Sequence, residues 1–210
     1  MKVLMTLLLF VLGVNAASLD DLTYTTADGK VTITDCDEAA TGGLVIPATI
    51  GGNPVTSIGD DAFRDCTSLT SITIPDSVTS IGGGAFYRCS SLTSITIPDG
   101  VTSIGGSAFC LCESITSITI PDGVTSIGDE AFLRCTSLTS IKIPDSVNSI
   151  GEKAFLNCTN LSAVTFLGDA PNVDTSTFEN ATPTIYRKPE AKGWGDTWAG
   201  RPVKLISEKP

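Results

Sequence analysis

The chain of 210 residues contains no histidine, and this absence limits the chemistry that its side chains can perform. Ser-His-Asp and Cys-His nucleophile systems need an imidazole as the general base. Histidine is also the commonest metal ligand, so only all-thiolate or carboxylate metal sites stay open. The sequence therefore argues against an enzyme, and it predicts no catalytic residues, no metal site and no cofactor.

Four aspartates recur at intervals of 23 residues, at Asp76, Asp99, Asp122 and Asp145. Stacked on a repeating structure they would form a column of carboxylates, and carboxylate oxygens are the ligands that calcium prefers. Each of them, however, follows Ile-Pro and precedes Ser or Gly, which is typical of a solvent-exposed turn. We favour the turn, with calcium binding as the alternative.

Five of the seven cysteines keep the same interval: Cys66, Cys89, Cys112, Cys135 and Cys158. Equivalent residues of stacked coils lie about 4.8 Å apart with parallel Cβ directions. A disulfide needs converging Cβ atoms at about 3.5–4.5 Å. We therefore expect this cysteine column to consist of free, buried thiols. Cys36 and Cys110 lie outside the column, and the sequence leaves their pairing open.

These side chains are positioned by a 23-residue repeat. Its phenylalanines fall at Phe63, Phe86, Phe109, Phe132, Phe155 and Phe178. A fixed period of 20–29 residues with Leu and Ile at set offsets is the signature of a leucine-rich solenoid. Within each repeat, Leu69, Ile72, Ile74 and their equivalents are expected to face inward. The last two have the period-2 spacing of a strand with one buried face, and a proline ends the strand. A glycine column predicts a bend with positive φ: Gly59, Gly82, Gly105, Gly128 and Gly151.

The chain divides into four segments. Residues 1–16 combine one lysine, an apolar run and a small-residue cleavage pattern, which predicts a secretory signal peptide; a retained anchor is the alternative. Residues 17–54 form an N-terminal cap, with a β-hairpin around Asp28-Gly29 and a degenerate first repeat. The repeats occupy residues 55–166. Residues 167–210, with Trp194 and Trp198, form a C-terminal cap that covers the core.

The unit L-x-S-I-x-I-P-x-x-V-x-x-I-G-x-x-A-F-x-x-C resembles the BspA-like leucine-rich repeat family, a group of surface or secreted proteins. The resemblance covers most of the chain after the signal peptide. It implies a mainly β fold: a right-handed leucine-rich repeat solenoid with a parallel β-sheet on one face, capped at both ends. For function it implies recognition of host or neighbour-cell proteins and matrix, without catalysis.

The formal net charge of −10 and the absence of a basic cluster argue against binding to nucleic acid and to anionic membranes. No second apolar segment follows the signal peptide, so we expect no membrane span in the mature chain. These features predict a secreted or cell-surface protein with a protein or extracellular-matrix partner.

The predicted contact surface is the outward side of the strands, because solenoids bind through a continuous face. Its residues are Ser71, Thr73, Ser94, Thr96, Ser117, Thr119, Ser140, Lys142 and Thr165. Two alternatives stay open. Threonine serves strand propensity alone, or the chain is a structural or water-ordering surface protein whose threonine rows act as in ice-binding proteins, although Lys142 interrupts the row. Asn157, Asn160 and Asn180 begin glycosylation triplets that matter only if the exporting cell glycosylates.

Overall fold

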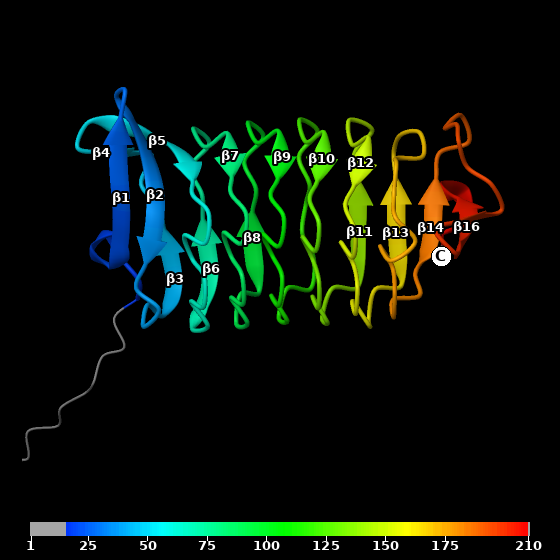
Figure 1. The fold of residues 1–210 in the computed structure, drawn as a ribbon, viewed down its shortest axis with the longest axis horizontal. Coiled ribbons are helices and arrows are strands. Elements are labelled where there is room, and N and C mark those ends of the chain that lie inside the picture. Colours follow the sequence, from blue (N-terminus) through cyan, green and yellow to red (C-terminus); the bar gives the residue numbers. More distant parts are fainter. Residues whose placement is uncertain (1–15, 210) are drawn as a thin grey trace, which may run out of the picture.

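A computed structural model describes residues 16–209, so residues 1–15 of the predicted signal peptide lie outside the described part of the chain. The chain winds into a parallel β-solenoid whose coils stack along the long axis of the molecule (Figure 1). The N-terminal hairpin lies at one end and β14–β16 at the other. The mainly β leucine-rich solenoid predicted from the repeat is confirmed.

Two parallel sheets lie on one side of the solenoid. The first contains β3 (Gly42–Val45), β6 (Leu69–Thr73) and β8 (Ser94–Thr96). The second contains β11 (Ser140–Ile143), β13 (Ala163–Phe166), β14 (Thr184–Arg187) and β16 (Arg201–Leu205), with β15 (Thr197–Trp198) antiparallel at its end. Residues 23 apart pair directly, as Thr73 does with Thr96.

A further sheet, which was not predicted from the sequence, runs along the side of the coils that contains the Ser-Ile segments. We call this side the return side. It begins with the hairpin β1 (Leu22–Ala27) and β2 (Lys30–Cys36), followed by β5 (Asn53–Ile58), to which β4 (Thr49–Ile50) is antiparallel. The two-residue Ser-Ile strands β7, β9, β10 and β12 continue it, at Ser80–Ile81, Ser103–Ile104, Ser126–Ile127 and Ser149–Ile150. Two residues per coil are too few to give a period-2 signal in the sequence.

The phenylalanine column fills the interior as expected. Adjacent rings from Phe63 to Phe178 stack with centroids 5.2–5.5 Å apart, and every ring is fully buried. The cysteine column lies beside it, and all seven cysteines are free and buried. Four of these thiols donate to a phenylalanine carbonyl oxygen in the preceding coils, Cys89 Sγ to Phe63 O at 3.1 Å being the first. A buried thiol here packs as an apolar group and also satisfies a backbone acceptor.

The expected positive φ of the glycine column is wrong. Gly59, Gly82, Gly105, Gly128 and Gly151 are not among the residues with positive φ. They are required because neighbouring coils approach too closely for a side chain: a Cβ on Gly105 would lie 2.6 Å from the carbonyl carbon of Gly82. Positive φ occurs elsewhere in each coil, mostly on other residues, such as Arg88, Leu111 and Arg134.

Both caps close the core. In the N-terminal hairpin, Asp28 and Gly29 have φ of 50° and 68°, as a tight turn between antiparallel strands needs. At the other end Trp194 and Trp198 pack on Phe166, with ring centroids 4.9 and 5.1 Å away. The 3₁₀ turns Leu19–Asp21 and Ile206–Glu208 are the helical elements of residues 16–209, and neither could cross a membrane.

Candidate interaction surface

We define the strand face as the outward side of β3, β6, β8, β11, β13 and β14, together with residues 117–120 between β8 and β11. It carries the predicted hydroxyl columns. Thr73, Thr96, Thr119 and Lys142 are exposed, as are Ser94, Ser117 and Ser140, whereas Ser71 is half-buried. The register pairs Thr73 with Thr96, Thr119 with Lys142, and Lys142 with Thr165. Eight of the nine predicted residues are therefore accessible on one surface.

The ninth, Thr165, faces outward but is buried, with 9% of its surface exposed. Lys209 near the end of the chain covers it: Nζ donates to Thr165 Oγ1 at 3.2 Å and lies 5.7 Å from the centroid of the Tyr186 ring. Tyr186, next to Thr165 in the register, is 7% exposed. The C-terminal tail thus closes one end of the column, which removes Thr165 from the surface open to a partner.

The structure extends the column beyond the predicted residues. At its N-terminal end Val45 pairs with Thr73, and 68% of Val45 is exposed. At its C-terminal end Tyr186 pairs with Lys204. Both ends lie in segments that the repeat pattern assigns to the caps, so the 23-residue interval could not place them on this face. Val45 gives the face an exposed apolar group that the hydroxyl columns lack.

The strand face is interrupted at residues 117–120. This segment belongs to neither sheet, and its single β-bridge joins Thr119 to Lys142. In the described chain no backbone hydrogen bond joins residues 94–97 to residues 117–120. The same coil departs from the repeat at Glu113, where other copies have Ser or Thr, and at Ile115, where they have Leu. We call this interruption the seam.

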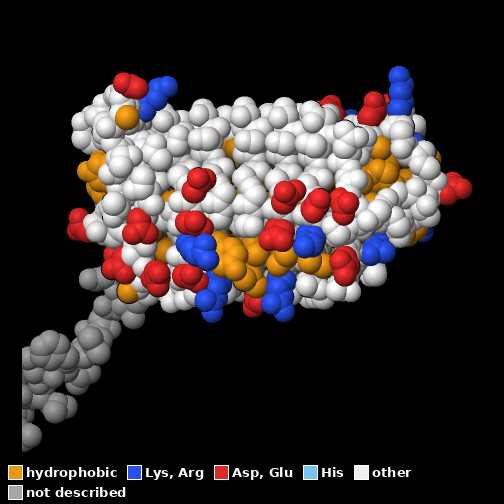
Figure 2. Space-filling view, viewed as in Figure 1, with side chains coloured by type: hydrophobic (Ala, Val, Ile, Leu, Met, Phe, Trp, Pro, Cys, Tyr) orange, Lys and Arg blue, Asp and Glu red, His pale blue; other side chains and the backbone are white. Residues whose placement is uncertain are grey.

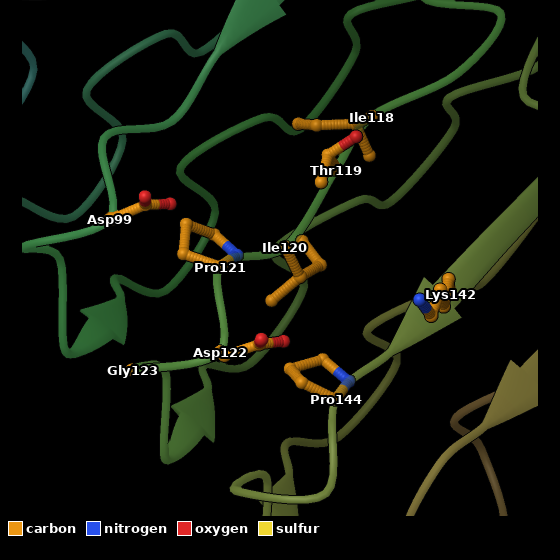
Figure 3. Close-up of a pocket in the computed structure, with 9 residues that line it drawn as sticks. All are labelled: Asp99, Ile118, Thr119, Ile120, Pro121, Asp122, Gly123, Lys142 and Pro144. Atoms are coloured by element: carbon orange, nitrogen blue, oxygen red, sulfur yellow. The ribbon is translucent and has the colours of Figure 1, made fainter.

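Two hollows lie beside Lys142 at the seam. The larger, of about 490 Å³, has an apolar lining of Ile118, Ile120, Pro121 and Pro144, with Asp99, Asp122 and Lys142 as its charged residues. Figure 3 shows that these residues come from successive coils. The smaller, of about 230 Å³, is lined by Ser117, Ser140, Lys142, Thr165 and Lys209 and by two isoleucines. We call it the lysine hollow.

Charge is sparse on the strand face and dense elsewhere. Among its predicted residues Lys142 alone is charged. In the view of Figure 2, acidic, basic and hydrophobic side chains gather along one long edge of the solenoid. The ion pairs of the described chain also lie outside the strand face: Arg64 with Asp61 and Asp65, and Arg88 with Asp65, at 3.1–3.6 Å.

The thiols offer no nucleophile. Burial raises the pKa of Cys110 to about 11 and that of Cys158 to about 12. These thiols are therefore protonated at neutral pH, and the thiolate is the reactive form. What the strand face presents is hydroxyls, a few charges and apolar hollows, which is chemistry for binding.

Comparison with known proteins agrees with the geometry. The model of the BspA type leucine-rich repeat region matches residues 56–184 in six copies. A leucine-rich repeat protein of T. pallidum is 28% identical with a TM-score of 0.70, over 82% of this chain and 86% of that one. One from Bacteroides ovatus is 31% identical with a TM-score of 0.65 over 82% of this chain, which spans half of that protein.

The pneumococcal vaccine antigen PcpA, at 17% identity and a TM-score of 0.51 over 85% of this chain and 65% of that one, shares the fold. No curated protein sequence matches the chain. The family model covers more than half of the residues. The chain therefore belongs to the BspA-type leucine-rich repeat family, whose solenoids generally serve as protein-interaction modules.

Proposed function

We propose that the chain is an exported interaction module that binds a protein or extracellular-matrix partner through the strand face, at the surface of the cell or after secretion. Export rests on the signal-peptide pattern of residues 1–16. The observation that carries the binding proposal is a row of exposed outward residues: Val45, Thr73 and Thr96, which pair in register, and, beyond the seam, Thr119 and Lys142, which also pair.

The surface suits a broad contact. Its hydroxyls sit on backbone that is already ordered, so little further ordering is needed on binding. Serine and threonine are weak anchors, since binding hot spots are enriched in large aromatic side chains and arginine. The apolar lining of the larger hollow and the exposed Val45 supply the groups that a partner side chain can bury against.

The water-ordering alternative is less well supported. It needs an unbroken row of exposed threonines, and the column contains Val45 and Lys142 besides a buried Thr165. The seam also interrupts the strand pairing of the row between Thr96 and Thr119. Freezing hysteresis of the purified protein tests this function directly, and we expect none.

The test of the binding proposal compares two triple variants with equal added charge. Thr73→Lys, Thr96→Lys and Thr119→Lys change the strand face. Thr79→Lys, Thr102→Lys and Thr125→Lys change exposed threonines of the return side. Against a panel of immobilised matrix and cell-surface proteins, we expect the first variant to bind its partner at least tenfold more weakly than wild type, and the second to stay within twofold. If only the second variant binds the partner more weakly, the partner contacts the return side and not the strand face.

A further inference from the structure

Two lysines line the lysine hollow, on a face that otherwise has little charge. Lys142 projects from β11, and Lys209 reaches it from the tail, 44 residues beyond Thr165, to which its Nζ donates. Both lysines line the same space of about 230 Å³. The exposed hydroxyls of Ser117 and Ser140 line it as well, so the hollow combines two cations with two hydroxyls able to donate hydrogen bonds.

Neither lysine forms a direct ion pair in the described part of the chain. No ion pair within 4.0 Å joins Lys142 or Lys209 to a carboxylate of residues 16–209, and no acidic residue lines the hollow. Two ammonium groups beside one another repel, and the repulsion grows as water is displaced. An anion bound between them is attracted to both ammonium groups, which offsets their mutual repulsion. It also accepts charge-assisted hydrogen bonds from both.

We propose that the lysine hollow binds a carboxylate, carried by an aspartate or glutamate in an exposed segment of the protein partner. This inference rests on the proposed function and specifies the chemistry of its partner. The space is large enough for one acidic side chain. The carboxylate would lie beside Lys142 and Lys209 and accept hydrogen bonds from Ser117 and Ser140.

The rest of the molecule favours a single carboxylate over an extended polyanion. The chain carries a net charge of −10, and Asp99 and Asp122 line the adjoining hollow on the other side of Lys142. Charges within about 8–10 Å of one another interact at physiological salt. A sulfated polysaccharide that crossed the hollow would bring its next charges toward these aspartates, whereas one acidic side chain flanked by uncharged residues would not.

The experiment titrates the protein with acetyl-Gly-Glu-Gly-amide, whose one charge is the glutamate carboxylate, and follows backbone amide shifts by NMR. We expect weak, saturable shifts at Ser140, Lys142 and Thr165. The peptide with Gln in place of Glu should cause none. Lys142→Thr, which restores the residue found at Thr73, Thr96 and Thr119, should weaken binding at least fivefold, and Lys209→Gln should act similarly. Lys30→Thr in the N-terminal hairpin is the control and should bind as wild type does.

Equal shifts with the Glu and Gln peptides, or unchanged binding by Lys142→Thr, would overturn the proposal. Tighter binding of a heparin tetrasaccharide that is lost in Lys142→Thr would also overturn it, because the hollow would then be a polysaccharide site. The proposed function has a separate readout. Suppose that the peptide fails to bind while the triple variant with lysine at positions 73, 96 and 119 still binds the protein partner more weakly than wild type. In that case this inference fails and the proposed interaction surface stands.

Discussion

The return side and the strand face are made by the same coils, yet only the return side is paired without interruption. There, the strands from β5 to β12 follow one another coil by coil. On the strand face the sheets stop at β8 and begin again at β11. The glycine column lies directly after the Ser-Ile strands and permits neighbouring backbones to approach closely, whereas the strand face has no such column. Close packing of neighbouring backbones thus keeps the return-side strands paired in successive coils. The strand face has no such column, and its strand pairing is lost at one coil.

The largest effect expected concerns the core that both sides share, and it follows from the buried thiols. An unfolded cysteine has a pKa near 8.5, whereas burial raises that of Cys110 to about 11 and that of Cys158 to about 12. The folded state then holds protons that the unfolded state releases. The stabilisation is complete below about pH 8.5 and is lost as the pH rises toward the folded values, by about 1.4 kcal/mol per pH unit for each thiol.

Urea unfolding at pH 7, 8.5, 9.5 and 10.5 measures this loss. In Cys110→Ala the free energy of unfolding should decrease less steeply between pH 9 and 10.5, by the contribution of one thiol. A free energy of unfolding that stays constant from pH 7 to 10 would contradict the protonated, buried column.

Replacing a glycine of the column with a larger residue should disrupt the backbone packing of the return-side strands and destabilise the fold. Gly105→Val would place its Cβ 2.6 Å from the Gly82 carbonyl, and because backbone must move to relieve this contact we expect a loss of about 3 kcal/mol or more. Gly123→Ser is the control, since serine occupies the equivalent positions 77 and 146, and it should cost less than about 0.5 kcal/mol. Chemical denaturation compares the two; equal losses would mean that close approach is not what requires the column.

Restoring the consensus at the seam should make the two sides more alike. Glu113→Ser combined with Ile115→Leu gives this coil the residues of its neighbours Ser90 and Leu92. We expect new backbone hydrogen bonds between residues 94–97 and 117–120, each contributing roughly 0.5–1.5 kcal/mol. Slower amide exchange in these two segments measures the closure. If exchange there is unchanged, these two residues are not the cause of the seam.

The smallest effect concerns Leu111, which has a φ of 62° in the coil that contains the seam. Leucine is strained in this region, and Asn adopts it more readily. Leu111→Asn should therefore raise the free energy of unfolding by roughly 0.5–1 kcal/mol. Leu133→Asn is the control, since Leu133 is half-buried and does not have positive φ; it should be neutral or destabilising. A loss of stability in Leu111→Asn would show that packing of Leu111 outweighs its backbone strain.

The features predicted from the sequence are those that every coil repeats. The Phe63–Phe178 stack, the free thiols and the outward Ser and Thr columns follow from the 23-residue interval, because each copy obeys the same local pattern. The seam lies in the one coil that departs from this pattern at Glu113 and Ile115. The burial of Thr165 depends on Lys209, which is distant in the sequence and belongs to no repeat. The glycine column was recognised in the sequence, but positive φ was the wrong explanation for it. The close approach of neighbouring coils, which requires these glycines, cannot be read from a single repeat.

Amide hydrogen exchange by NMR at Ile118 and Gly128 is the sharpest test of the seam, because both residues belong to one coil and lie on opposite sides of it. The Gly128 N–H donates to Ile104 O at 2.9 Å on the return side. In the described chain the Ile118 N–H has no hydrogen bond to the preceding coil. We expect the Ile118 amide to exchange at least 100-fold faster than the Gly128 amide. Equal protection of the two amides would contradict a strand face that is open at the seam.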